Sequence, residues 1–299
     1  MTPVLQLSHL TKRYRETVAL DDVTVAFEEN TICGLLGRNG AGKTSLMSIA
    51  TAQNVATSGS VRAFGEAPYE NAAVLQRMCF VRESQPYPED ARPGHAFAAA
   101  GMFFPRWDAA FARQLARDFE LPMNRRIKKL SRGQLSAVGV IIGLASRAEI
   151  TFFDEPYLGL DAVARQLFYD RLLADYGEHP RTIVLSSHLI DEVANLLETV
   201  VLLDHGRLVL DDDVEAIRGG AVSVIGAADA VEQFTLGRDV IHRERLGGTA
   251  SVTVLGRLTD AERRELLAVG LEMAPVSLQQ LIVRLTDGEH TAELKGASA

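Results

Sequence analysis

Apolar residues along the chain form short runs of two kinds, which alternate with helical patterns. Residues 4–7 and 23–27 alternate apolar and polar side chains, as strands with one buried face do. Nearly continuous apolar runs, expected to be strands buried on both faces, are residues 31–36, 150–153 and 182–186. Helical patterns cover residues 42–50, 134–146 and 163–176. This order predicts an α/β fold with a parallel core sheet, preceded by antiparallel strands.

Other segments depart from this alternation. Residues 86–130 hold five of the ten prolines and have helical periodicity, so we interpret them as a helical insertion, part of a helical subdomain over about residues 86–146. Residues 200–210 are expected to form a hairpin that closes the first domain near residue 213. The pattern over 220–299 predicts the order β-α-β-β-α-β of a small, ferredoxin-like α+β domain, with a final helix.

Composition narrows the class of protein. The 299 residues carry a net charge of −8, and this acidic balance argues against broad nucleic-acid binding. No apolar stretch approaches the length of a membrane-spanning helix, and the first residues do not resemble a secretory signal. The two cysteines, Cys33 and Cys79, stand in apolar runs, which fits a reducing cytoplasm better than a disulfide framework.

The first candidate site is a glycine-rich loop, GRNGAGKT at residues 37–44, which matches G-x-x-x-x-G-K-[ST]. Such a loop turns successive backbone N–H groups inward around phosphate oxygens, and the helix that follows adds its positive end. Lys43 is expected to bridge the β- and γ-phosphates of ATP, and the Thr44 hydroxyl to bind Mg²⁺. A glycine-rich turn without function is the alternative, but a buried strand precedes this loop and a helix follows it. The expected nucleotide-binding residues of this segment are Gly37, Arg38, Asn39, Gly40, Ala41, Gly42, Lys43, Thr44 and Ser45.

A second candidate element is the apolar strand that ends in Asp154 and Glu155. In open α/β sheets, ligands lie beyond the carboxyl ends of the strands. We therefore expect Asp154 to hold the Mg²⁺ and Glu155 to polarise the attacking water. The alternative is a pair of solvated carboxylates at a strand end.

Several further motifs occur in a fixed order around these two. LSRGQ at residues 130–134 resembles the LSGGQ signature of the ATP-binding cassette (ABC) ATPases, and GLD at residues 159–161 resembles their D-loop. His188 follows a strand, where this family has its switch histidine, and Tyr14 resembles the aromatic residue that stacks on adenine. Taken separately, Tyr14 also suits an edge strand, His188 a strand end and Ser131 a helix N-cap. Together they resemble the ATP-binding subunit of an ABC transporter, of the single-cassette type with a C-terminal extension.

The resemblance implies a mechanism and partners. Two copies of the chain would form a head-to-tail homodimer with two ATP molecules, each between one phosphate loop and the partner's signature. The signature residues on the nucleotide would be Ser131, Gly133 and Gln134. His188 would contact the γ-phosphate and Asp161 would couple the two sites. A separate membrane permease would receive the motion through the helical insertion, so the chain is expected in the cytoplasm, peripheral on the inner face of the cell membrane.

Three departures from the family pattern stand out. Arg132 replaces the first glycine of the signature, and Tyr157 stands where threonine is usual. The Q-loop, which the family uses to contact Mg²⁺ and the permease, has Glu83 in the expected register and Gln85 two residues later. We favour Gln85 as the nucleotide- and metal-contacting residue, with Glu83 as the alternative.

The sequence therefore predicts an ATPase subunit of a transporter, with export slightly favoured over import. One alternative is a soluble ABC protein that acts on ribosomes or DNA, although a single cassette and an acidic balance weigh against it. Another is an ATP-sensing module with low turnover, suggested by the altered signature and Q-loop. In the insertion, Phe97, Phe103, Phe104 and Trp107 fit either a docking surface or core packing. The C-terminal domain is expected to be regulatory or dimer-stabilising, with a simple packing appendage as the alternative.

Overall fold

The computed structural model describes residues 3–83 and 85–286, which fall into two compact units. Of the described residues, the first unit contains 3–83, 85–188 and 196–211, and the second contains 189–195 and 212–286. The first unit has two sheets and the second has one, and each unit has its own buried apolar cluster. Among the described residues, no helix is both long and apolar enough to cross a membrane.

A six-stranded sheet forms the centre of the first unit, in the order β5-β6-β7-β3-β8-β9. These strands are β3 (Ile32–Leu36), β5 (Met78–Arg82), β6 (Ile150–Asp154), β7 (Thr182–Ser187), β8 (Thr199–Asp204) and β9 (Arg207–Asp213). The strands from β5 to β8 in this order are parallel, and all side chains of β3, β6 and β7 are buried, as their continuous apolar runs predict. The turn at His205 and Gly206 has positive φ at both residues, the conformation that suits a two-residue hairpin turn.

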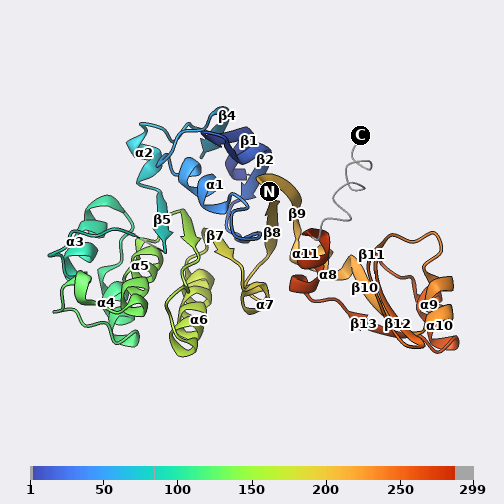
Figure 1. Ribbon diagram of the computed structural model, residues 1–299. Coiled ribbons are helices and arrows are strands. Elements are labelled where there is room, and N and C mark those ends of the chain that lie inside the picture. Colours follow the sequence, from blue (N-terminus) through green and yellow to red (C-terminus); the bar gives the residue numbers. More distant parts are fainter. Residues whose placement is uncertain (1–2, 84, 287–299) are drawn as a thin grey trace. The chain divides into compact units, whose positions relative to one another are not determined.

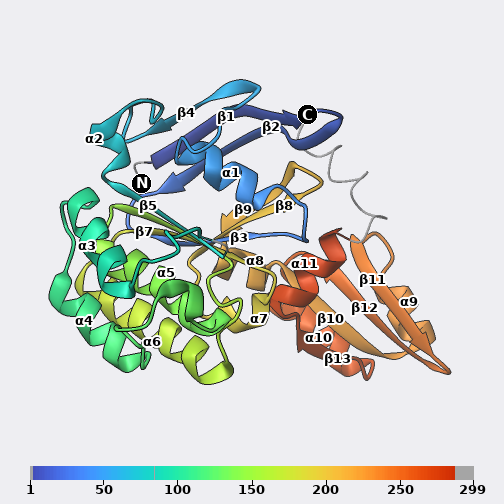
Figure 2. The ribbon, with the colours of Figure 1, turned by 60° about the vertical axis from the view of Figure 1, so that its left-hand side comes forward.

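A three-stranded antiparallel sheet packs over this core. It contains β1 (Pro3–Tyr14), β2 (Thr17–Glu28) and β4 (Ser58–Ala63), in the order β2-β1-β4. Helix α1 (Lys43–Ala50) lies between the two sheets (Figure 2), and its buried side chains join one apolar cluster with both. A short helix, α2 (Ala72–Leu75), leads back to β5.

The opposite face of the parallel sheet is covered by α5 (Arg132–Ser146) and α6 (Ala162–Glu178) (Figure 1). Helix α5 lies close to the sheet at Gly143. A Cβ at this position would lie 2.4 Å from a ring carbon of Phe153, so the approach requires glycine. The predicted helical subdomain contains α3 (Pro93–Phe103), α4 (Ala109–Asp118), the 3₁₀ turn η1 (Ile127–Lys129) and α5. Within it Phe97 is buried, Phe104 and Trp107 are half-buried and Phe103 is exposed.

The second unit begins with α7 (Ile190–Val193) and continues after β9 with α8 (Val214–Gly219). Its sheet contains β10 (Ala221–Ala227), β11 (Val240–Leu246), β12 (Thr249–Leu255) and β13 (Glu272–Pro275). The strands are antiparallel in the order β11-β12-β10-β13, and α9 (Ala228–Phe234) and α10 (Asp260–Ala268) pack on one face of them. With the final helix α11 (Leu278–Thr286), these elements have the predicted order β-α-β-β-α-β-α.

The two cysteines are core residues, Cys33 in β3 and Cys79 in β5, and both are free thiols. Burial raises the pKa of each to about 12, so neither forms a thiolate at neutral pH. We expect the native protein at pH 8 to resist Ellman's reagent on the scale of minutes, and guanidinium-unfolded protein to release two equivalents of thionitrobenzoate. Rapid labelling of either thiol in the native protein would contradict this placement.

Candidate functional site

The glycine-rich loop connects β3 to α1, and its backbone conformation requires glycine at both ends. Gly37 has φ +143, and a Cβ there would lie 2.3 Å from the carbonyl oxygen of Leu203. Gly42 has φ +107 and stands at the N-cap of α1, where a Cβ would lie 2.5 Å from the Ala19 carbonyl oxygen. The loop is therefore held against neighbouring backbone, with the N-terminus of α1 directed into the site.

Lys43 is the cation of this loop, and its side chain is enclosed by it. Its Nζ donates to the carbonyl oxygens of Gly37 and Arg38 at 2.7 and 3.2 Å, and lies 3.8 Å from Oε1 of Glu155. Burial lowers the pKa of Lys43, while the carboxylates of Glu155 and Asp154 act in the opposite direction. This cation is thus poised next to backbone carbonyls, where a phosphate oxygen would be a stronger partner.

Asp154 ends β6 beside the loop and fits a divalent cation. Its Oδ2 accepts a 2.6 Å hydrogen bond from the Thr44 hydroxyl, and its Oδ1 accepts from the Ser186 hydroxyl at 2.8 Å. Hard oxygen donors of this type suit Mg²⁺, which binds one or two protein groups and completes its octahedron with water and phosphate oxygens. Among the residues that the structure describes, no three or more His, Cys, Asp or Glu side chains cluster in a way that suits a metal ion.

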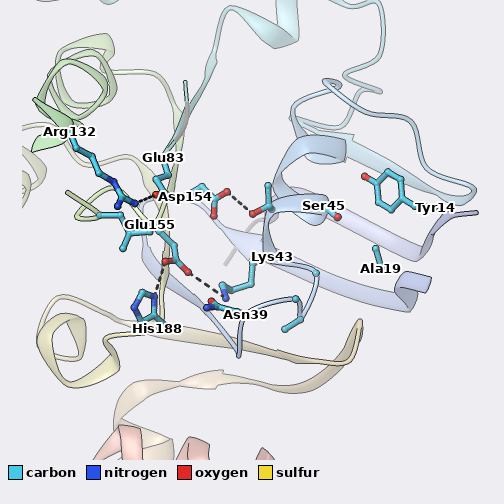
Figure 3. A pocket seen from close by; sticks show the side chains of 15 residues that line it. Tyr14, Ala19, Asn39, Lys43, Ser45, Glu83, Arg132, Asp154, Glu155 and His188 are labelled. Carbon is cyan, nitrogen blue, oxygen red and sulfur yellow. Dashed lines mark hydrogen bonds and ion pairs between the residues drawn. The ribbon is translucent and has the colours of Figure 1, made fainter. Parts of the chain in front are cut away.

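Glu155 lies between a lysine and a histidine. Its Oε2 is 2.7 Å from Nδ1 of His188, and its Oε1 faces Lys43 (Figure 3). The backbone of Glu155 has φ +48, a conformation that costs a non-glycine residue energy and often marks functional sites. Its N–H donates to the Ser186 hydroxyl at 2.9 Å, so this serine holds both consecutive carboxylate residues.

The pocket at this edge of the sheet has a volume of about 770 Å³ and opens between the loop and the strand ends. Tyr14 and Ala19 line the side nearest the antiparallel sheet (Figure 3), and Tyr14 is 43% exposed, so that part of its surface is accessible to a base. The remaining lining residues are Asn39, Gly40, Ala41, Gly42, Lys43, Thr44, Ser45, Glu83, Arg132, Asp154, Glu155, Leu158 and His188. The structure therefore gathers most of the predicted residues around one cavity.

Arg132 of the predicted signature lines this pocket, whereas Ser131, Gly133, Gln134 and the D-loop residue Asp161 do not. The signature and the D-loop lie next to each other. Ser131 and Gln134 form a capping box at the start of α5, and Asp161 caps α6 by accepting from the Ala164 N–H at 2.8 Å. A Cβ on Gly133 would lie 2.6 Å from the carbonyl oxygen of Gly159. The start of α5 and the D-loop are thus in close backbone contact.

The sequence did not predict the role of Ser186, the Glu83–Arg132 ion pair or the Tyr157–His188 contact, although Glu83 itself was the alternative Q-loop residue. Ser186 was not singled out, although a polar residue at the end of an apolar strand, paired in register with Asp154, is a usable signal. Glu83 lines the pocket and forms an ion pair with Arg132, whereas Gln85 is not among the lining residues. The pocket thus favours Glu83 over our preferred Gln85, whose role stays a prediction. Tyr157, noted only as a departure, contacts His188.

A phosphate loop on a parallel sheet, with an acidic strand end beside it, defines a P-loop ATPase. Comparison with known proteins shows which family the chain resembles. The family model described as "ABC transporter" matches residues 20–158. The dimeric structure of the ATP-binding cassette MJ0796, in a post-hydrolysis state with ADP and Pi, superimposes with a TM-score of 0.62 at 20% identity, covering 70% of this chain and 98% of that one.

Three curated proteins with similar sequences are also named as ATP-binding proteins. The ABC transporter ATP-binding protein YtrB of Bacillus subtilis is 23% identical over 290 residues, 96% of this chain and 99% of its own. The doxorubicin resistance ATP-binding protein DrrA of Mycobacterium tuberculosis is 28% identical over 209 residues, 67% of this chain and 62% of its own. The glycine betaine uptake system ATP-binding protein YehX of Escherichia coli is 28% identical over 295 residues, 91% and 86% of the two chains. These similarities support an ABC transporter ATP-binding subunit with an ATPase cassette.

The Glu83–Arg132 pair predicts a measurable effect on metal binding. Because Glu83 adds a negative charge to the site, Glu83→Gln should raise the Mg²⁺ concentration that gives half-maximal ATPase activity, by roughly 2- to 5-fold. Arg132→Gln should lower that concentration. The matched control is Gln85→Ala, which should leave the Mg²⁺ titration unchanged. A shift with Gln85→Ala and none with Glu83→Gln would restore Gln85 as the metal-facing residue.

Proposed function

We propose that this ATPase drives a separate membrane permease, as a head-to-tail homodimer with two ATP molecules at its interface. The observation that carries the proposal is the separation of two half-sites within the first unit. The phosphate loop, Asp154, Glu155 and His188 gather around one pocket. Arg132 of the signature reaches this pocket, while Ser131, Gly133, Gln134 and Asp161 lie outside it. A second copy related by two-fold symmetry would bring its signature to this pocket. The signature of the first copy would then face the pocket of the second.

Within each composite site, we assign a role to each residue. Lys43 and the loop N–H groups bind the phosphates, and Thr44 and Asp154 hold Mg²⁺. When bound, the metal supplies positive charge that stabilises the transferring phosphoryl group. Glu155 orients the attacking water, and His188 contacts the γ-phosphate from the position that its bond to Glu155 sets. Because ATP touches both chains, it favours the closed dimer, and loss of its γ-phosphate removes that preference.

The surface offered to the permease lies at the end of α3. Met102 and Phe103 are 84% and 70% exposed, whereas Phe97 of the same helix is buried against Trp107, with ring centroids 6.1 Å apart. The sequence left open whether the aromatic residues of the helical insertion form a docking surface or pack in a core. The insertion contains both a buried aromatic side chain and an exposed apolar surface. Large exposed apolar side chains side by side are typical of contact sites for another protein or a membrane.

Export is the direction we propose. The resemblance to single-cassette chains with C-terminal extensions supports it, as does similarity to a doxorubicin resistance protein. Import is the second candidate, because the similar YehX belongs to an uptake system and aligns over a larger share of both chains. With the permease in hand, ATP-dependent accumulation of its cargo inside inverted membrane vesicles would show export, and ATP-dependent loss would show import.

The assigned roles predict distinct failures for two variants. Lys43→Ala should abolish ATP binding and hydrolysis, because it removes the buried cation from the phosphate loop. Glu155→Gln should lower kcat by on the order of 100-fold or more while keeping ATP bound, since only the group that acts on the water is changed. Light scattering after size exclusion should then show a dimer for Glu155→Gln with Mg-ATP and a monomer for Lys43→Ala. Full activity of Glu155→Gln would refute its role.

The Glu155→Gln variant, which is expected to keep ATP bound as a dimer, can be used to capture the permease. Glu155→Gln protein incubated with Mg-ATP and detergent-solubilised native membranes should retain a stoichiometric polytopic membrane protein, identified by mass spectrometry. Adding Met102→Ser and Phe103→Ser should reduce that recovery at least several-fold, because the docking surface loses its apolar side chains. Tyr69→Ser, which alters another exposed apolar residue of the first unit, is the control. A ribosomal or DNA-repair partner without a membrane protein would overturn the transporter role.

A further inference from the structure

The side chain of Tyr157 lies directly behind the Glu155–His188 pair. It follows Pro156 in the turn after β6, and only 1% of it is exposed. Its hydroxyl oxygen accepts the backbone N–H of His188 at 2.9 Å and the hydroxyl of Ser187 at 3.2 Å. The Tyr157 hydroxyl therefore anchors the backbone at His188, whose side chain lines the pocket.

The same hydroxyl also meets the imidazole. Its oxygen lies 3.1 Å from Nδ1 of His188, the atom that is 2.7 Å from Oε2 of Glu155. The two rings meet edge to face, with centroids 5.6 Å apart and planes at 60°. Thus the backbone, the ring plane and Nδ1 of His188 all contact one buried side chain, and the remaining ring nitrogen, Nε2, is left for other partners.

A threonine at this position could not make these contacts. Its hydroxyl lies one bond beyond Cβ, whereas the tyrosine carries its hydroxyl across the full width of a ring. Holding a catalytic group in one orientation lowers the entropic cost of reaching the reactive geometry. We propose that Tyr157 is a positioning residue that fixes the imidazole of His188 against Glu155. This inference rests on the roles proposed above for His188 and Glu155.

Tyr157→Phe tests the inference, because it removes the hydroxyl and keeps the buried ring. We expect kcat to fall about 10-fold, with the KM for ATP changed less than 2-fold, since Tyr157 does not line the nucleotide pocket. Ser187→Ala, which removes one of the donors to the hydroxyl, should lower kcat by a smaller factor. Tyr69→Phe is the matched control and should keep full activity.

A second readout separates positioning from general destabilisation. In protein labelled with ¹⁵N-histidine, the ring nitrogen signals of His188 should move in Tyr157→Phe, because the hydroxyl that lies 3.1 Å from Nδ1 is removed. His188→Ala identifies these signals. Unchanged His188 signals and unchanged kcat in both Tyr157→Phe and Ser187→Ala would overturn the inference, provided that His188→Ala and Glu155→Gln lower kcat. If those two also keep full activity, the proposed roles of the site fail instead.

Discussion

The parallel pairing of β3, β6 and β7 is the constraint on which the site depends. In this register Leu36 pairs with Ser187, and Asp154 pairs with Ser186, so three strands end at the same edge of the sheet. Each strand delivers one functional segment at its carboxyl end, as open α/β sheets do. A shift of one strand by one residue would reverse its side chains and separate Asp154 from the phosphate loop.

Buried charge at this edge is balanced within a small network. Lys43, Asp154 and Glu155 are all largely withdrawn from water, and an unpaired charge in such a place costs several kcal/mol. Lys43 is compensated by two loop carbonyls and by Glu155, and Asp154 by two hydroxyls. Apart from Glu155, the compensating groups are neutral donors and acceptors that a phosphate or a cation can displace. The site is therefore stable without ligand and yet prepared for one.

Site residues that belong to a contiguous motif or follow a predicted strand could be predicted from the sequence. Contacts between residues far apart in the sequence could not. Asp154, Glu155 and His188 follow predicted buried strands, so topology alone places them near the glycine-rich loop. Strand β4 was missed because its residues are mostly exposed and lack an apolar pattern, and it pairs with β1 at an edge. The Glu83–Arg132 and Tyr157–His188 contacts join residues 49 and 31 positions apart, and no local pattern marks such pairs.

These two contacts also explain why departures from the family pattern can coexist with a complete site. A glutamate in the Q-loop register and an arginine in the signature would each add an uncompensated charge near the nucleotide. The ion pair between them removes most of that net charge while adding little stability, because both side chains are substantially exposed. Tyr157, at a position where threonine was expected from the resemblance, has a buried ring that supplies contacts to His188. The altered positions thus compensate one another, which favours an active ATPase over an ATP sensor with low turnover.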